Sequence, residues 1–330
     1  MKFEGLFVRR LALGLCLTSL LDCSAGAAQS SGTSSFSVLN IPTGARAAAL
    51  GQAFTSVPND IQGLVYNPAC LATMAASQAS FEHLSYIADV VEEGIAAGHA
   101  GRDQEMSWGV LANYLHVGQI NRTVATGLPT GDGFTEAGTF STYDMILGGS
   151  VAGPILIEGL SLGTTFKFLR ESLADASSNG AAVDAGLLYQ GNVERSWNVG
   201  AAVQNVGFAS KFAEAAVKLP LTLRVGASGQ PFAQWLFTTD FVKRTDTEGE
   251  ADVGAEVTPK KFFSVRVGYR YALNRTDLGG LSNLSMGMGF RFNQMSLDYA
   301  FVPLGDLGLT HRISLNFRFK VHRLALFKLN

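Results

Sequence analysis

From about Gln78 onward, apolar and polar residues alternate along the chain with the period of two that is typical of β-strands. The segment FSVRVGYRY at 263–271 places Phe, Val, Val, Tyr and Tyr on one side and Ser, Arg, Gly and Arg on the other. The same alternation recurs in LGTTFKFLR at 162–170, NLSMGMGFRF at 283–292 and ISLNFRF at 313–319. We predict that these segments are strands whose two faces meet different surroundings.

Two architectures contain strands of this kind. In a soluble β-sandwich the apolar faces form a shared core, whereas in a transmembrane barrel they meet lipid while the polar faces line the lumen. Aromatic residues near the ends of the predicted strands favour the barrel, because Tyr and Trp are enriched at membrane–water interfaces. These residues are Tyr86, Tyr143, Tyr189, Trp197, Trp235 and Tyr299. We therefore predict an all-β chain folded as an antiparallel transmembrane β-barrel.

Residues 78–320 are assigned to this barrel. About 14 strands would give roughly 17 residues for each strand and its connection, and a membrane strand needs only about 9–11; twelve or sixteen strands also divide this length plausibly. Longer loops are expected near 118–139, 171–180, 206–219, 244–250 and 272–282, with tight turns between them. Alternating short and long connections are typical of an up-and-down barrel with its tight turns on one side.

The composition supports a membrane barrel and excludes other classes. Glycine accounts for 37 of 330 residues and charged residues for 16 %, and no run of 18 apolar residues follows the N-terminus. A helical membrane protein would need such a run, so this class is excluded. The formal net charge of −2, without a basic stripe, argues against nucleic acid as a partner.

The first 27 residues are predicted to be a secretory signal peptide. Lys2, Arg9 and Arg10 precede the apolar segment LALGLCLTSLL, and Ala-Gly-Ala at 25–27 is typical of a cleavage site. Cys23, in LLDC, also loosely resembles a lipoprotein signal, so lipidation of this residue is an open alternative. After cleavage at residue 27, Cys70 would be the only cysteine, which excludes an intramolecular disulfide.

Residues 28–77 lack the strand pattern. The stretch 44–56 is dominated by Ala and Gly and is expected to form a short helix or a closely packed extended segment. Asn59 or Asp60 could cap a short helix that runs to about Tyr66 and is stopped by Pro68.

Catalytic and metal-binding signals are missing from the sequence. The five histidines are scattered, and no H-E-x-x-H, G-x-S-x-G or Walker motif occurs. The acidic stretches are too short for an EF-hand loop. We predict that the protein is not an enzyme and uses no metal and no cofactor.

Two end segments carry a family resemblance. GARAAALGQAFTSVPNDIQGLVYNPACLA at 44–72 resembles the N-terminal signature of the PorV/PorQ outer-membrane family, distant relatives of FadL-type fatty-acid transporters. Cys70 stands where that family usually has Gly. LDYAFVPLGDLGLTHRISLNFRF at 297–319 is similar to the family's closing hairpin. The tail at 321–330, beyond Phe319, has no explanation in this resemblance.

The resemblance implies that residues 28–77 form a hatch inside or below the barrel. Asn67 and Pro68 would then form a rigid turn that launches the first strand. Arg46, the one cation of the hatch, would either pair with Asp60 or reach periplasmic water. A ligand pocket beside the hatch would include Phe54, Leu64, Leu71 and Met74, although these side chains could equally be hatch–wall packing.

The resemblance also implies a function in the bacterial outer membrane. The leading hypothesis is a barrel, surrounded by outer-membrane lipid, that admits or binds hydrophobic small molecules in a FadL-like manner. The rival is a PorV-like scaffold for secretion or surface attachment of other proteins, with loops such as 123–139 holding the secreted partner; a purely structural role is a third reading. An enclosed apolar cavity beside the hatch, with a break in the wall, would favour transport, and a filled lumen would favour the scaffold.

Overall fold

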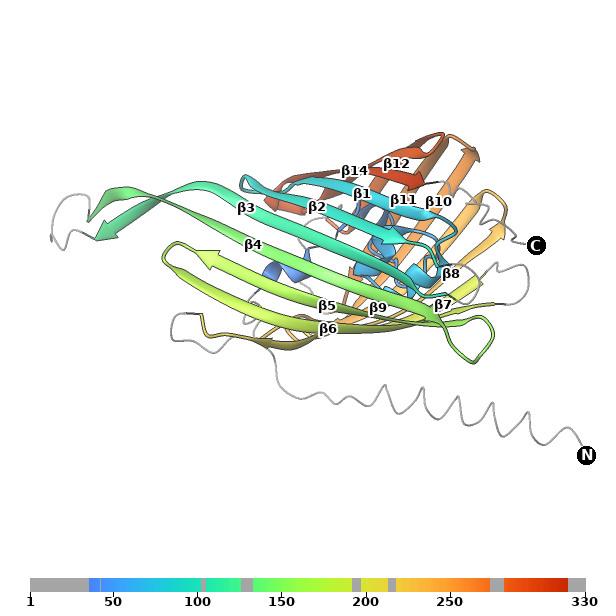
Figure 1. Cartoon of the computed structure of the whole chain (residues 1–330). Coiled ribbons are helices and arrows are strands. Elements are labelled where there is room, and N and C mark those ends of the chain that lie inside the picture. The colour runs from blue at the N-terminus through green and yellow to red at the C-terminus, as the bar shows by residue number, and fades with distance from the viewer. Residues whose placement is uncertain are drawn as a thin grey trace, which may run out of the picture. The chain divides into compact units, whose positions relative to one another are not determined.

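The computed structural model describes residues 36–41, 43–101, 105–125, 133–191, 197–212, 218–273 and 282–319. In this part of the chain, 14 strands form one closed antiparallel sheet (Figure 1). The strands are β1 (Ser77–Ser85), β2 (Val90–His99), β3 (Ser107–Ala125), β4 (Phe134–Pro154), β5 (Leu160–Leu173), β6 (Ala176–Gln190), β7 (Trp197–Ala209), β8 (Thr222–Phe232), β9 (Trp235–Arg244), β10 (Glu250–Lys260), β11 (Phe263–Ala272), β12 (Leu284–Phe292), β13 (Met295–Pro303) and β14 (Leu309–Phe319).

The ring closes where β1 pairs with β14, with Phe81 opposite Leu315. Every other pair consists of strands that are consecutive in the chain, so the order is that of an up-and-down barrel. The prediction of an antiparallel barrel of about 14 strands is confirmed, and the sandwich alternative is wrong. None of the helices among the described residues has the length and apolar character needed to cross a bilayer.

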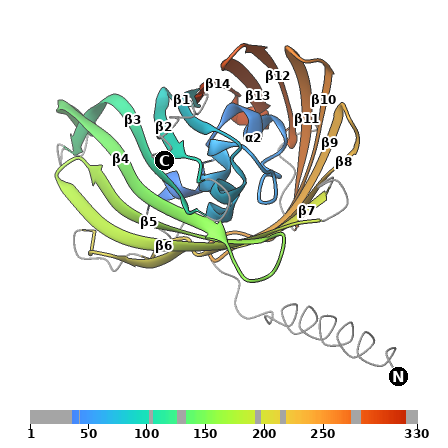
Figure 2. The ribbon, with the colours of Figure 1, turned by 45° about the vertical axis from the view of Figure 1, so that its right-hand side comes forward.

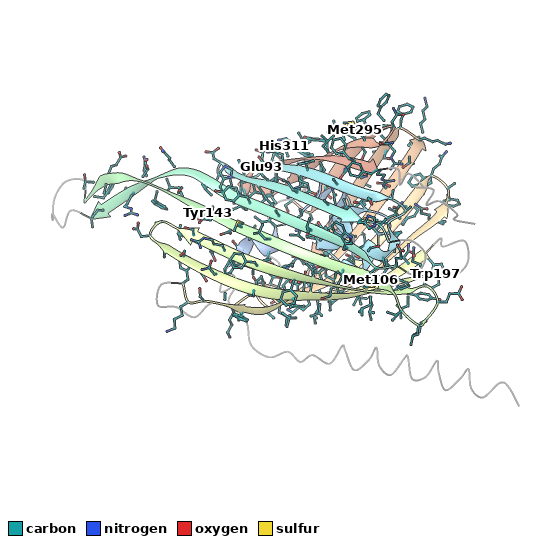
Figure 3. All side chains as sticks on the ribbon, viewed as in Figure 1. Glu93, Met106, Tyr143, Trp197, Met295 and His311 are labelled. Carbon is teal, nitrogen blue, oxygen red and sulfur yellow. The ribbon has the colours of Figure 1, made fainter. Side chains whose placement is uncertain are left out.

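The two faces of the wall differ as the alternation predicted. In β9, for example, Trp235, Phe237 and Phe241 are exposed on the outside, while Thr238 and Asp240 are buried on the inside. Figure 3 shows how densely side chains cover the outside of the barrel. The apolar faces therefore point away from the lumen, and the polar faces point into it.

The segment before β1 lies inside the ring (blue in Figure 2) and is called the hatch here, residues 36–41 and 43–74. It contains η1 (Ser37–Asn40), α2 (Ala45–Ala49), η2 (Ile61–Val65) and η3 (Pro68–Thr73). Asp60 caps η2 by accepting a hydrogen bond from the Gln62 N–H at 3.0 Å. Asn67 caps η3 in the same way, so the expectation that Asn67 and Pro68 launch the first strand is wrong: they open a further helical turn.

The connections differ from the expected loops in two places. β5 and β6 are joined by residues 174 and 175 alone, so 171–180 is a tight hairpin. β3 extends to Ala125 and β4 starts at Phe134, so most of the expected loop at 118–139 is strand, and the two strands project beyond their neighbours (Figure 1). Thr and Val at these positions favour a strand, which outweighs the loop-like Gly and Thr content. A short helix, η4 (Gly305–Leu307), joins β13 and β14.

The signal peptide at 1–27, the alternative at Cys23, the tip of the β3–β4 connection at 126–132 and the tail at 321–330 lie outside the described residues.

Candidate functional site

Seven glycines on the inner wall allow the hatch to approach the barrel backbone. They are Gly98, Gly163, Gly186, Gly200, Gly254, Gly268 and Gly287, on β2, β5, β6, β7, β10, β11 and β12, and we call them the glycine belt. A Cβ at any of these positions would lie closer than 3.0 Å to an atom of the hatch. At Gly287, for example, it would be 2.5 Å from the Cβ of Ala49. The belt therefore accounts for part of the high glycine content and holds the hatch on several sides.

Polar side chains of the wall accept hydrogen bonds from the hatch backbone. Asp240 Oδ2 accepts from the N–H groups of Phe54 and Thr55, at 3.0 and 2.9 Å. Glu82 accepts from the Gly44 N–H at 2.6 Å, and Ser314 from the Ala45 N–H at 2.8 Å. Gly44 and Ala45 stand at the start of α2, and Phe54 and Thr55 lie outside the hatch helices, so the wall supplies the acceptors for these N–H groups.

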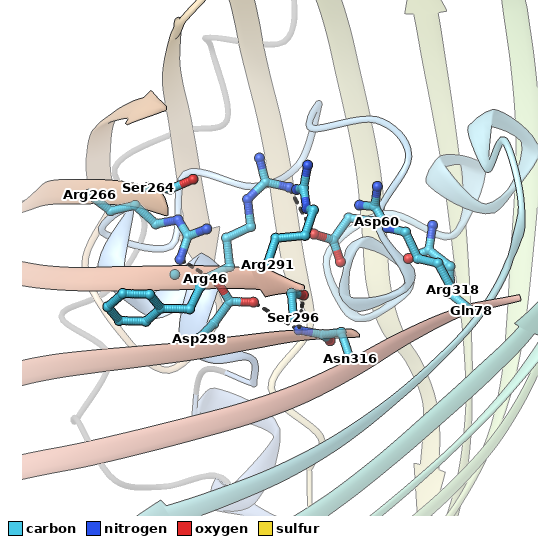
Figure 4. Close-up of a pocket in the computed structure, with 12 residues that line it drawn as sticks. Arg46, Asp60, Gln78, Ser264, Arg266, Arg291, Ser296, Asp298, Asn316 and Arg318 are labelled. Carbon is cyan, nitrogen blue, oxygen red and sulfur yellow. Dashed lines mark hydrogen bonds and ion pairs between the residues drawn. The ribbon is translucent and has the colours of Figure 1, made fainter. Parts of the chain in front are cut away.

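Arg46 pairs with Asp60 inside the hatch (Figure 4) and joins the hatch to the wall through Glu256. Its guanidinium lies 2.8 Å from Asp60 and makes a two-pronged contact with Glu256 on β10, also at 2.8 Å. Glu256 also pairs with Arg266, which in turn contacts Asp298 at 2.6 Å. Burial disfavours the charge of Arg46, but Glu256 and Asp60 outweigh it, so the pKa of Arg46 lies above its ordinary value. The expected pair with Asp60 is thus present, and the side chain is only 16 % exposed rather than reaching into open water.

A small polar cavity lies beside this charged network, between the hatch and β11–β14 of the wall (Figure 4). Its volume is about 20 Å³, and Arg291 and Arg318 line it together with Arg46 and Asp60. A cavity of this size holds about one water molecule. In the part of the chain that the structure describes, no three His, Cys, Asp or Glu side chains converge as metal ligands.

On the opposite side of the lumen, at β3–β5, buried apolar side chains stand among polar ones such as Asn113, Asp144 and Lys167. Leu111 and Leu115 of β3, Ile146 of β4 and Leu169 of β5 are buried and face inward, and we call these four residues the apolar seat. Phe36, the residue before η1, and Val38, within η1, belong to the same apolar cluster. A second cavity, of about 40 Å³, lies between η1 and this part of the wall. The lumen therefore has an apolar patch among polar residues at β3–β5, and the Arg46 network with Glu256, Arg266 and Asp298 at β10–β13.

The four predicted ligand residues separate into two groups. Leu64, Leu71 and Met74 belong to the apolar cluster that includes η1 and the apolar seat. Phe54 lies in a different cluster with Leu50 and Tyr66, and its ring centroid is 5.6 Å from that of Tyr66. All four side chains are buried, and neither cavity beside the hatch approaches the roughly 150 Å³ that holds a benzene molecule.

Our sequence analysis missed the apolar seat itself. Its signal is a pair of adjacent apolar residues that interrupts the alternation, as at 110–111, 146–147 and 168–169. One residue of each pair faces outward as expected, and the other adds an apolar side chain to the lumen.

The sequence matches a known protein family over most of its length. Residues 18–315 match the uncharacterised protein family UPF0164. The chain belongs to this family. The PorV/PorQ assignment remains a prediction for this UPF0164 member, and a search of curated proteins found no match.

Solved structures with the same fold include hydrophobic-compound transporters. The Ralstonia pickettii toluene transporter TbuX is 15 % identical, with a TM-score of 0.59, over 84 % of this chain and 98 % of TbuX. The Pseudomonas putida toluene transporter TodX is 14 % identical, with a TM-score of 0.55, over 83 % and 96 %. A Pseudomonas aeruginosa FadL homologue is 12 % identical, with a TM-score of 0.56, over 84 % and 98 %. At these identities the likeness concerns the fold.

Proposed function

We propose that this protein is a bacterial outer-membrane barrel that admits hydrophobic small molecules along the apolar seat in its lumen. The apolar seat is the observation that carries the proposal. The inner wall of a water-filled barrel is polar, whereas here Leu111, Leu115, Ile146 and Leu169 face the lumen. The fold shared with the toluene transporters supports the same function. The exposed apolar outer face and the expected signal peptide support the outer-membrane location.

Within this proposal, η1 is the removable part of the hatch. It is held by apolar contacts and by two hydrogen bonds: Phe36 N–H to Glu171, and Asn40 to Asp246, each 3.0 Å. The remainder, residues 43–74, is held by the Arg46 network and by the glycine belt. Because apolar contacts with η1 can be replaced by equivalent contacts with an apolar ligand, displacement of η1 costs little when such a ligand is present.

The proposal is tested by measuring the uptake of radiolabelled toluene by cells that lack other hydrophobic-compound transporters. Leu169 and Leu188 are both fully buried on the inner wall, but Leu169 lies in the cluster with η1 and Leu188 packs against Ala69 and Cys70 of the hatch. We expect L169N to lower the uptake rate and the matched control L188N to retain it, at equal amounts of folded barrel in the outer membrane. Equal uptake by both variants would contradict a route over the apolar seat.

A second candidate function is the scaffold for secreted or surface-attached proteins. The observation that favours it is the small size of the two cavities beside the hatch. If cells that produce the unaltered protein accumulate no more toluene, or any other apolar compound offered, than cells without it, transport is refuted and the scaffold becomes the better proposal.

A further inference from the structure

The turn between β4 and β5 has an unusual composition for its position. Residues 155–159 read Ile-Leu-Ile-Glu-Gly, and the exposed fractions of Ile155, Leu156 and Ile157 are 40 %, 106 % and 59 %. The turn is ordered by hydrogen bonds, with the Ile155 N–H donating to the Leu160 carbonyl and the Leu160 N–H to the Ile157 carbonyl, each at 3.0 Å. Three consecutive large apolar residues in water are unfavourable, so a partner is expected for this turn.

Other turns at the same end of the barrel lack this feature. β8 and β9 are joined by Ala233 and Gln234, and β12 and β13 by Asn293 and Gln294. The next connection along the chain, 191–196, reads GNVERS and is polar by sequence. The β10–β11 turn, Lys261 and Phe262, exposes a single large apolar side chain. Among the turns compared, the run of three apolar residues is therefore particular to the β4–β5 turn.

The surroundings of the turn identify its partner. In both ribbon views the turn leaves the wall and points away from the lumen (Figures 1 and 2). Met106, which is 56 % exposed, packs over Gly153 at the end of β4, and Trp197 lies against Tyr189, with ring centroids 5.5 Å apart. Figure 3 places Met106 and Trp197 at this end of the barrel. Trp and Tyr are typical of the membrane–water interface, so the turn continues the lipid-facing surface.

Three of the connections at this end of the barrel have only two residues, and short turns are typical of the periplasmic side. We propose that the β4–β5 turn inserts Ile155, Leu156 and Ile157 among the acyl chains of the periplasmic leaflet, as a lateral anchor of the barrel. The inference rests on the proposed outer-membrane location. Glu158, the exposed residue after the three apolar ones, reaches the head groups. The anchor lies at the base of β3–β6, the longest strands of the barrel. It therefore fixes the depth at which this side sits in the bilayer.

Tryptophan fluorescence in lipid vesicles tests the anchor. The native tryptophans are replaced (W108F, W197F, W235F), and single tryptophans are introduced as L156W, A233W and F166W. Ala233 is the matched control in a turn at the same end, and Phe166, 68 % exposed on the wall, is the control for lipid contact. The vesicles contain phosphatidylcholine with or without brominated acyl chains, and iodide is the aqueous quencher.

We expect L156W to lose its emission to brominated lipid about as strongly as F166W and to resist iodide, while A233W shows the reverse. If L156W behaves like A233W, the turn is in water or awaits a periplasmic protein, and the anchor is refuted although F166W still reports lipid. If F166W itself is not quenched by brominated lipid, the proposed membrane location fails instead.

A second measurement covers the case in which the tryptophan-free barrel does not fold. L156C is introduced into the otherwise native chain, whose own Cys70 is buried. A charged maleimide added to vesicles whose periplasmic turns face outward should label L156C far more slowly than it labels A233C. Equal labelling rates would overturn the anchor.

Discussion

Replacing Gly163 by alanine tests whether the glycine belt holds the hatch. A Cβ at this position would overlap the backbone of Pro68 and Ala69 and would lie 2.6 Å from the Pro68 carbonyl oxygen, where ordinary contact begins at 3.4 Å. The hatch or the wall must therefore move by more than 0.8 Å, the difference between these two distances, because the Ala69 nitrogen and the Pro68 carbonyl carbon lie closer still. Because the atoms in the way belong to backbone, no side chain can rotate to make room. Overpacking of this kind costs about 1–3 kcal/mol.

Gly149, on the neighbouring strand β4, is the matched control. It faces outward, and an added Cβ would find no atom within 4 Å. G149A should therefore leave the free energy of unfolding unchanged or raise it by about 0.4–1 kcal/mol, because alanine restricts the unfolded chain. Urea unfolding in lipid vesicles, followed by the heat-modifiable gel band, measures both variants. If G163A unfolds at the same urea concentration as G149A, the proposed contact between belt and hatch does not contribute to stability.

Two substitutions and one labelling experiment test how the hatch is held. R46A leaves Glu256 with only part of its charge compensation and should lower the free energy of unfolding in the same urea titration by about 3–5 kcal/mol; a loss no larger than that of a surface substitution would contradict the role of this network. D240N keeps the shape of the side chain but replaces the carboxylate that accepts from the Thr55 N–H, so we expect the free energy of unfolding to fall by about 1–2 kcal/mol and amide exchange at Thr55 to become faster; unchanged exchange would refute the role of Asp240 in holding the hatch. Cys70 is buried, and burial raises the pKa of its thiol, so the folded protein should not react with an aqueous maleimide until it is unfolded; rapid reaction of the folded protein would show that the hatch opens readily.

The strands of the barrel could be predicted because each carries its own two-faced pattern. In β11, Ser264 and Arg266 point inward and Val265 and Val267 outward, as the alternation alone indicated. The same alternation is consistent with a closed ring, because the charged inner face of such strands must be shielded from lipid. The cap at Asp60 was also readable, since it depends on residues that are adjacent in the chain.

The interior could be predicted less well, because its contacts join residues far apart in the sequence. Arg46 and Glu256 are separated by 210 positions, and no local pattern pairs them. The apolar seat was missed for a related reason: an inward-facing Leu111 next to an outward-facing Val110 looks like ordinary strand hydrophobicity. The hairpin between β5 and β6 was mistaken for a loop because its Ser and Ala residues carry little strand preference by themselves.

The distribution of the belt has a consequence for how the molecule is assembled. Its glycines come from seven strands that run from β2 to β12, so nearly the whole circumference fits around residues that are synthesised before any strand. Once the ring is closed, a segment that is covalently joined to β1 could not easily be inserted into contacts as close as these. The N-terminal segment must therefore be in place while the sheet is still open, and the seam between the first and last strands closes around it.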